Sequence, residues 1–230
     1  SGGGIGFARD SGSDAKSAGG PIHSVSRPAG VPPEPSRELQ FLYAVTLGLF
    51  DYLRKSRSRG YVVSLSGGAD SATCALLVQR AFAYAARELG PAETLRRLGR
   101  MDLSERLEFG PDAAENAARI TSELLYTIYQ ATDQSSDTTR TAASALATAI
   151  QSSHSEVNVQ QLMDAYRKRL EGVLDRPLDW QEDDLALQNI QSRARSPMAW
   201  FLANTTGSLL ITTSNRSEGA VGYSTMDGDT

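Results

Sequence analysis

A strand, a tight turn and the start of a helix are predicted in sequence by the stretch Tyr61-Val62-Val63-Ser64-Leu65-Ser66-Gly67-Gly68-Ala69-Asp70-Ser71. Its first half is short, apolar and β-branched, which is typical of a buried strand in a parallel sheet. Helical spacing of apolar residues then runs from Ser71 to Leu89. This order predicts the first unit of an α/β domain.

The same alternation extends outward from this stretch, with a helix expected before it and three further strands after it. A domain of this kind has a mainly parallel sheet flanked by helices, and ligands lie beyond the carboxyl ends of its strands. The polar segment 90–116 reads as an excursion, and Pro197 should kink or split the last helix. The expected strands are 124–129, 156–159 and 208–213, and the expected helices are 38–55, 137–150, 159–174 and 183–203.

Composition limits the class of protein. The chain has 230 residues, of which 40% are hydrophobic, enough for a substantial core. Its net charge of −4 gives no basic stripe for duplex nucleic acid, so no nucleic-acid partner is expected. Cys74 is the single cysteine, and no long apolar run indicates a membrane segment. These features favour a cytoplasmic location.

Residues 1–36 differ in composition from the rest of the chain. They contain eight Gly, five Pro and seven Ser, with almost no apolar periodicity. We expect a flexible leader or linker over 1–36 and the functional domain over 37–230.

The turn after the predicted strand is suited to binding an anion. Gly67 and Gly68 allow backbone N–H groups to approach a phosphate, the following helix presents its positive end, and Ser66 and Ser71 add hydroxyl donors. The turn is not a Walker loop, because no Lys follows the glycines. Asp70 would repel a bare phosphate but would hold Mg²⁺ beside a pyrophosphate. The alternative is a Gly-Gly turn with a structural role alone.

This loop resembles the pyrophosphate loop of the N-type ATP pyrophosphatases, which cleave ATP between its α and β phosphates. Two later blocks resemble the NAD synthetases, most closely their glutamine-dependent branch. They are Leu187-Gln188-Asn189-Ile190-Gln191-Ser192-Arg193-Ala194-Arg195 and Thr212-Thr213-Ser214-Asn215-Arg216-Ser217-Glu218-Gly219-Ala220-Val221-Gly222-Tyr223-Ser224-Thr225-Met226-Asp227-Gly228-Asp229. The three ordered blocks cover roughly residues 38 to 230, and the resemblance implies the adenine nucleotide alpha hydrolase-like fold.

The resemblance also implies a reaction. Members of the family amidate deamido-NAD⁺ to NAD⁺ in an ATP- and Mg²⁺-dependent reaction that passes through an adenylate and releases pyrophosphate and AMP. The nitrogen comes from ammonia, which a glutaminase domain can supply from glutamine. Family members usually assemble as homo-oligomers.

Site residues follow from the resemblance position by position. The ATP-binding set is Ser66, Gly67, Gly68, Asp70, Ser71 and Thr213, and the metal ligands are Asp70 and Glu218. The set for deamido-NAD⁺ is Asn189, Arg193, Glu218, Tyr223, Ser224, Thr225 and Met226.

Other residues leave alternatives open. Arg193 and Arg195 lie two apart on a helix, so at most one should face the site. Thr127, Gln130 and Thr132 are placed at the end of the second strand, where adenosine lies in the resembled fold. The run from Ser135 to Arg140 resembles a family segment, but capping of the next helix explains it equally well.

Candidates for other chemistry are weak. His23 and His154 stand apart from each other, so a zinc site is not expected. Cys74 falls among Ala and Leu on the helix behind the loop, a place for a small buried residue rather than a nucleophile.

Two departures from the family keep other functions open. The chain has no room for the glutaminase domain, and it stops at Thr230, before further segments of the family that help to bind ATP and nicotinate. A truncated ATP-binding module without catalysis is one alternative, and another ATP pyrophosphatase amidotransferase is a second.

Overall fold

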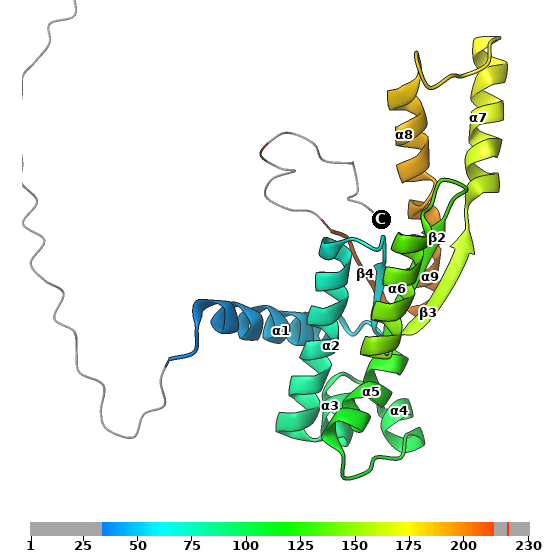
Figure 1. Ribbon diagram of the computed structural model, residues 1–230. Coiled ribbons are helices and arrows are strands. Elements are labelled where there is room, and N and C mark those ends of the chain that lie inside the picture. The colour runs from blue at the N-terminus through cyan, green and yellow to red at the C-terminus, as the bar shows by residue number, and fades with distance from the viewer. Residues whose placement is uncertain (1–33, 214–219, 221–230) are drawn as a thin grey trace, which may run out of the picture. The chain divides into compact units, whose positions relative to one another are not determined.

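Four parallel strands form one sheet at the centre of the computed structural model, which describes residues 34–213 and Ala220 (Figure 1). The order across the sheet is β3-β2-β1-β4. In register, Tyr61 of β1 pairs with Leu125 of β2 and with Leu209 of β4. The predicted α/β class with a parallel sheet is confirmed. The strands are β1 (Tyr61–Ser64), β2 (Leu125–Ala131), β3 (Ser153–Asn158) and β4 (Leu209–Ile211).

Helices connect the strands and begin with recognisable caps. Ser36 caps the first helix by accepting a hydrogen bond from the Leu39 amide at 3.3 Å, and Asp112 caps another through the amides of Ala114 and Glu115. The helices are α1 (Arg37–Ser56), α2 (Ala69–Leu89), α3 (Pro91–Arg97), α4 (Met101–Arg106), α5 (Ala113–Leu124), α6 (Asp137–Ile150), α7 (Gln160–Leu174), α8 (Asp184–Arg193) and α9 (Ser196–Thr206). Residues 1–33 of the expected leader lie outside the described residues, so its extent stays a prediction.

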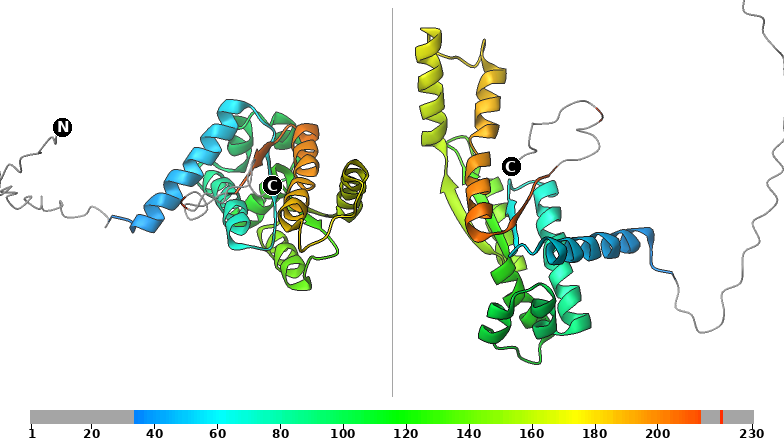
Figure 2. Two further views of the ribbon diagram at one scale, coloured as in Figure 1. Left: turned by 90° about the horizontal axis from the view of Figure 1, so that it is seen from above. Right: turned by 180° about the vertical axis from the view of Figure 1, so that it is seen from behind.

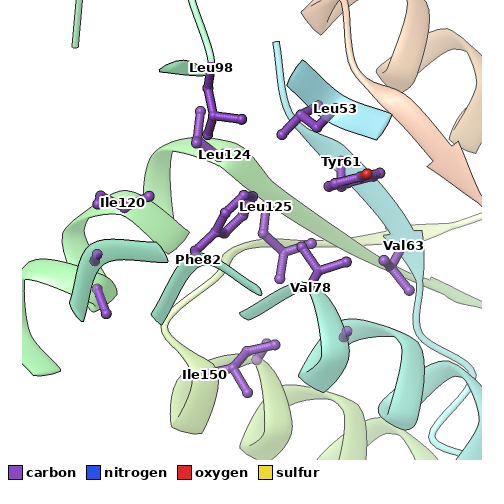
Figure 3. Close-up of a cluster of buried hydrophobic side chains, with 14 of the residues drawn as sticks. Leu53, Tyr61, Val63, Val78, Phe82, Leu98, Ile120, Leu124, Leu125 and Ile150 are labelled. Carbon is purple, nitrogen blue, oxygen red and sulfur yellow. The ribbon is translucent and has the colours of Figure 1, made fainter. Parts of the chain in front are cut away.

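The main core lies between one face of the sheet and the helices α2, α5 and α6 (Figure 3). Alternate residues of a strand face the same side, which puts Tyr61, Val63 and Leu65 on this face with Leu125 of β2. Phe82 of α2 is fully buried against them. Burial of a phenylalanine side chain contributes about 2 kcal/mol by transfer from water, so this cluster fixes the helices to the sheet.

The second face of the sheet carries the intervening residues and is covered by α9. Val62 and Ile128 point to this side, and both are buried, as are Ala199 and Ala203 of α9. The alanines allow α9 to pack closely on β1 and β4. Residues at the carboxyl ends of β1 and β2 meet the start of α9 on this side.

The structure adds detail to two sequence expectations. The segment 90–116, expected as a polar excursion, forms α3, α4 and the beginning of α5, and it buries Leu95, Leu98 and Leu103 in the main core. The predicted split of the helix 183–203 is confirmed: the segment divides into α8 and α9, with the break at Ala194 and Arg195, just before the proline. Proline is favoured in the first turn of a helix, and it occupies that place in α9.

Helices α7 and α8 lie side by side and extend beyond the carboxyl ends of the strands (Figures 1 and 2). No residue of α7 is buried. None of the described helices has the length and apolar content that crossing a bilayer requires.

Candidate functional site

The turn between β1 and α2 is held in a conformation that suits glycine. Gly67 has a φ of 81°, and a Cβ at that position would lie 2.4 Å from the carbonyl oxygen of Thr139 in α6. The backbone of the turn therefore passes directly against the first turn of α6. Residues 66–68 (the loop, from here on) lie at the carboxyl end of β1, as the sequence predicts.

Two serine hydroxyls fold the loop from within. The Ser66 amide donates to Ser71 Oγ at 3.2 Å, and the Gly68 amide donates to Ser66 Oγ at 3.2 Å. The two hydroxyl oxygens are also 3.2 Å apart, and Ser71 Oγ donates to the Gly68 carbonyl oxygen at 3.3 Å. Ser71 is buried and Ser66 is exposed. Hydrogen bonds of these two serines thus hold the loop, and Ser66 remains exposed to solvent.

The positive end of α2 opens onto this loop. Gly68 is the N-cap residue, and no side chain caps the helix. The first backbone N–H groups of α2 therefore have no capping side chain as a hydrogen-bond partner. Partial positive charge at such an end attracts a phosphate. The combination of a glycine turn, hydroxyls and a helix start is suited to an anion.

Asp70 lies exposed in the first turn of α2. A carboxylate at the edge of a phosphate site is the kind of ligand that Mg²⁺ takes together with phosphate oxygens. Within residues 34–213 and Ala220, no group of three or more His, Cys, Asp and Glu residues could hold a metal by itself. The oxygen chemistry of Asp70 fits a metal shared with substrate, whereas Glu218 lies outside the described residues.

Cys74 lies one helical turn beyond Asp70 and is half-buried. Burial, and secondarily the charge of Asp70, raise the pKa of its thiol. A raised pKa keeps the thiol protonated and disfavours a nucleophilic role.

The start of α6 forms the second wall of the site. Ser136 is the N-cap and accepts from the Thr139 amide at 3.2 Å, so the capping interpretation of this segment is confirmed. Thr139 Oγ1 also lies 3.0 Å from the Tyr129 hydroxyl oxygen, which anchors α6 to β2. The position of α6 against the loop is therefore set by the sheet.

The three residues suggested for adenosine do not lie together. Thr127 is in the middle of β2 and is 1% exposed, and its Oγ1 lies 2.9 Å from His154 Nδ1 and 2.8 Å from Ser152 Oγ. Its hydroxyl therefore joins β2 to the segment around β3. Burial lowers the pKa of His154, which lies within β3 rather than before it. Gln130 and Thr132 do lie at the end of β2, and both are buried.

The two arginines of the block 187–195 have different surroundings. Arg193 is exposed on α8, where its Nη1 donates to Asn189 Oδ1 at 2.9 Å. Arg195 lies past the end of α8, and its Nε donates to the carbonyl oxygen of Gln130 at 3.3 Å. The sequence prediction selected Arg193 and missed the position of Arg195 at the sheet edge, because it placed both arginines on one helix before the break expected at Pro197.

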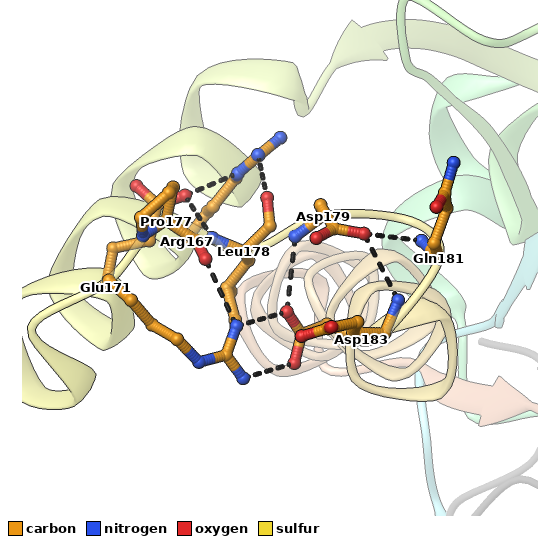
Figure 4. Close-up of polar contacts among 9 residues, drawn as sticks. Arg167, Glu171, Pro177, Leu178, Asp179, Gln181 and Asp183 are labelled. Carbon is orange, nitrogen blue, oxygen red and sulfur yellow. Dashed lines mark hydrogen bonds and ion pairs between the residues drawn. The ribbon is translucent and has the colours of Figure 1, made fainter.

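Ionic contacts and hydrogen bonds fix the segment that connects α7 to α8 (Figure 4). Arg176 makes two hydrogen bonds to Asp183, at 2.7 and 2.8 Å, and lowers the pKa of that carboxyl to about 2. Glu171 Oε1 accepts from both Arg167 Nε, at 2.9 Å, and the amide of the buried Leu178, at 3.0 Å. These contacts orient the helix that carries Asn189 and Arg193.

Thr213 is half-buried, two residues past the end of β4, and so lies after the strand that borders β1. The remaining predicted site residues lie outside the described residues: Glu218, Tyr223, Ser224, Thr225 and Met226.

Comparison with known proteins shows which family the sequence resembles. The NAD synthase family model matches residues 41–230. A glutamine-dependent NAD(+) synthetase of Oryza sativa subsp. indica is 32% identical over 204 residues, which cover 82% of this chain and 27% of that protein. The chain therefore spans about a quarter of the length of this relative.

Solved structures agree with this result. The crystal structure of a glutamine-dependent NAD(+) synthetase from Cytophaga hutchinsonii is similar with a TM-score of 0.79 and 44% identity, covering 84% of this chain and 34% of that one. A glutamine-dependent NAD+ synthetase from Acinetobacter baumannii in complex with ADP has a TM-score of 0.62 at 20% identity, covering 86% of this chain and 30% of that one. The latter similarity concerns the fold alone.

Proposed function

The chain belongs to the NAD synthase family, and from this premise we propose that it forms the synthetase site of a glutamine-dependent NAD synthetase. This site converts deamido-NAD⁺ to NAD⁺ with ATP and ammonia. The ammonia is free or comes from glutamine through a glutaminase domain. Because the chain spans about a quarter of its relative, the activity of the whole protein is part of the proposal.

The observation that carries the proposal is the glycine loop at the carboxyl end of β1. It is folded by its own serines, it opens onto the start of α2, and α6 closes one side of it. These features support the binding of the pyrophosphate part of ATP. We assign the binding of ATP to Ser66, Gly67, Gly68 and Ser71, with Asp70 and Thr213 at the edge of the ATP site.

The roles within this loop divide by atom. The amides at the start of α2 and the exposed hydroxyl of Ser66 bind phosphate oxygens, while the buried hydroxyl of Ser71 keeps the loop in shape. Most of the catalysis is then alignment and stabilisation of charge rather than covalent chemistry by the protein.

Bound Mg²⁺ would supply positive charge to balance the charge of the pyrophosphate. Asp70 would hold it from the loop, and Glu218 would be its second protein ligand. The exposure of Asp70 at the loop edge supports this assignment.

We assign the binding of deamido-NAD⁺ to residues of α8 and of the segment after β4. Arg193 and Asn189 share one hydrogen bond on α8, and together they present donors to the carboxylate or the phosphates of the dinucleotide. The remaining members of this set are Glu218, Tyr223, Ser224, Thr225 and Met226.

Two steps complete the reaction. An oxygen of the nicotinate carboxylate forms a bond to the α phosphorus of ATP, and the bond to the β-phosphate oxygen breaks and releases pyrophosphate. Ammonia nitrogen then attacks the carboxyl carbon, the bond to the AMP oxygen breaks, and ammonia loses a proton to leave the amide. The loop aligns the first step, and α8 holds the acceptor for both.

The test is release of AMP and pyrophosphate from ATP with Mg²⁺ and ammonium, with and without deamido-NAD⁺, and with direct detection of NAD⁺. We expect release that depends on deamido-NAD⁺ and yields one NAD⁺ per AMP. Release that ignores deamido-NAD⁺ would assign the chain to a different ATP pyrophosphatase reaction. ATP binding with no release at all would indicate a binding module without catalysis.

The purified chain also allows a test of its oligomeric state. Family members are expected to form homo-oligomers, and we extend this expectation to the chain as part of the proposal. Sedimentation analysis over a range of concentrations would show a dimer or larger assembly, and a monomer at all concentrations would contradict it.

A further inference from the structure

Gln130 is a buried amide at the place where the sheet meets the loop. It is 4% exposed and lies on the second face, at the carboxyl end of β2. Its Nε2 donates to Ser64 Oγ at 3.2 Å. Ser64 is the last residue of β1, two residues before Ser66, so the side chain of Gln130 is attached to the root of the loop.

The backbone of the same residue is attached to the other side of the site. Arg195 Nε donates to the Gln130 carbonyl oxygen at 3.3 Å. Arg195 is the N-cap residue of α9 and lies two residues beyond Arg193, the last residue of α8. One residue of β2 therefore contacts both the strand that leads into the loop and the junction that leads out of α8.

Stability alone does not account for a glutamine at this position. Its Oε1 is buried and has no hydrogen-bond partner within the part of the chain that the structure describes. A buried polar atom without a partner destabilises a folded protein, whereas an apolar side chain of the same length would avoid that cost. The amide must contribute something other than core packing.

We propose that Gln130 is a positioning residue that couples the ATP loop to the α8–α9 junction through Ser64 and Arg195. The coupling rests on the proposed function, because it joins the assigned ATP site to the assigned dinucleotide helix. Gln130 holds the end of β1 in register through Ser64, and Arg195 holds the end of β2 relative to α8. When the loop takes up ATP, its backbone is then already aligned with the acceptor.

The test is Gln130→Met, which keeps the approximate length of the side chain and removes both polar atoms of its amide. In the unliganded chain, we expect faster hydrogen exchange at the amides of residues 65–68 and a melting temperature within about 3 °C of the parent. The dissociation constant for ATP with Mg²⁺ should rise about fivefold to tenfold, as for the loss of one hydrogen bond. Gln161→Met on the exposed face of α7 is the matched control and should change none of these quantities.

Ser64 supplies a second arm. Ser64→Ala should speed hydrogen exchange in the loop as Gln130→Met does. The double variant should exchange little faster than either single variant, because both substitutions remove the same contact. Ser64→Thr keeps the hydroxyl and should recover most of the affinity that Ser64→Ala loses. Full additivity in the double variant would overturn the coupling.

The outcomes separate this inference from the proposed function. Unchanged loop exchange in Gln130→Met overturns the positioning role, whether or not ATP binding changes. A large loss of melting temperature in Gln130→Met also overturns it and leaves Gln130 as a residue of the core. Faster loop exchange in a chain whose parent form does not bind ATP upholds the coupling and contradicts the proposed function.

Discussion

Gly67 in the loop and Thr139 in α6 approach each other so closely that a Cβ on Gly67 would lie 2.4 Å from the Thr139 carbonyl oxygen and 2.7 Å from its Cα. These are backbone atoms, which cannot turn aside as a side chain can. The contact joins the loop after β1 to the helix after β2, although 72 residues separate the two in sequence. It therefore depends on glycine for both space and conformation.

Gly67→Ala is expected to lower the free energy of unfolding by at least about 2 kcal/mol, because it adds strain at positive φ and a clash with α6. Urea unfolding measures this change. Gly172→Ala on α7 is the control, since a Cβ there meets nothing within 4 Å. That variant should gain about 0.5–1 kcal/mol from helix propensity. Equal effects at the two glycines would show that the contact with α6 does not constrain the loop.

Asp70→Asn removes a negative charge with little change in volume. The exposed position predicts an unchanged melting temperature. Mg²⁺-dependent release of pyrophosphate should fall by at least about a hundredfold, because the metal would lose the carboxylate in the first turn of α2. Glu105→Gln, an exposed charge change on α4, is the control and should retain full activity. Normal turnover by Asp70→Asn would remove this residue from the metal site.

Arg193→Ala should raise the dissociation constant for deamido-NAD⁺ about tenfold or more, as expected for the loss of a charge-assisted hydrogen bond. ATP affinity should stay close to that of the parent, because Arg193 lies on α8 and not at the loop. Titration calorimetry with each ligand gives both constants, with Lys168→Ala on α7 as a control for loss of a positive charge. Equal weakening of the two ligands would contradict the assignment to the dinucleotide.

The contact between Arg100 and Asp102 predicts a stability that depends on pH. Arg100 is buried, and it lowers the pKa of Asp102 from 3.8 to about 2. Because the folded pKa is the lower one, the contribution of this carboxylate is present above about pH 4 and disappears as the pH falls toward 2.

Asp102→Asn should therefore cost about 1 kcal/mol at neutral pH, a value discounted for its half-exposed side chain. The difference between variant and parent should shrink between pH 4 and pH 2 in urea unfolding. A difference that stays constant over this range would show that charge is not its cause.

Much of the fold could be predicted from local sequence. The strand-turn-helix order around Ser66 is visible because a β-branched run, two glycines and a helical repeat follow one another. The bounds of α6 were predicted at 137–150, since Ser136 caps it and an Ala-rich sequence sustains it. Similarity in three ordered blocks indicated the family, which the comparisons confirm.

Local sequence failed where burial decides the structure. Helices α3 and α4 have seven and six residues, too few to be stable alone, and the polar composition of 90–116 hides them. They form because Leu95, Leu98 and Leu103 enter a core built by α2 and α5. Thr127 was one of three open candidates for an adenosine contact, and its hydroxyl lies close to Ser152 and His154, a pairing that depends on the register between β2 and β3.

By itself, the sequence determined the chemistry available to this protein: the glycine turn, its serines, Asp70 and the family to which they belong. Only the tertiary structure decided which distant residues surround that turn. Gln130 reaches Ser64 across 66 positions, and Arg195 reaches Gln130 across 65. These meetings depend on strand order and on the packing of α9 against the second face, and such contacts leave no periodic signal in the sequence because each is made once, between elements that only folding brings together.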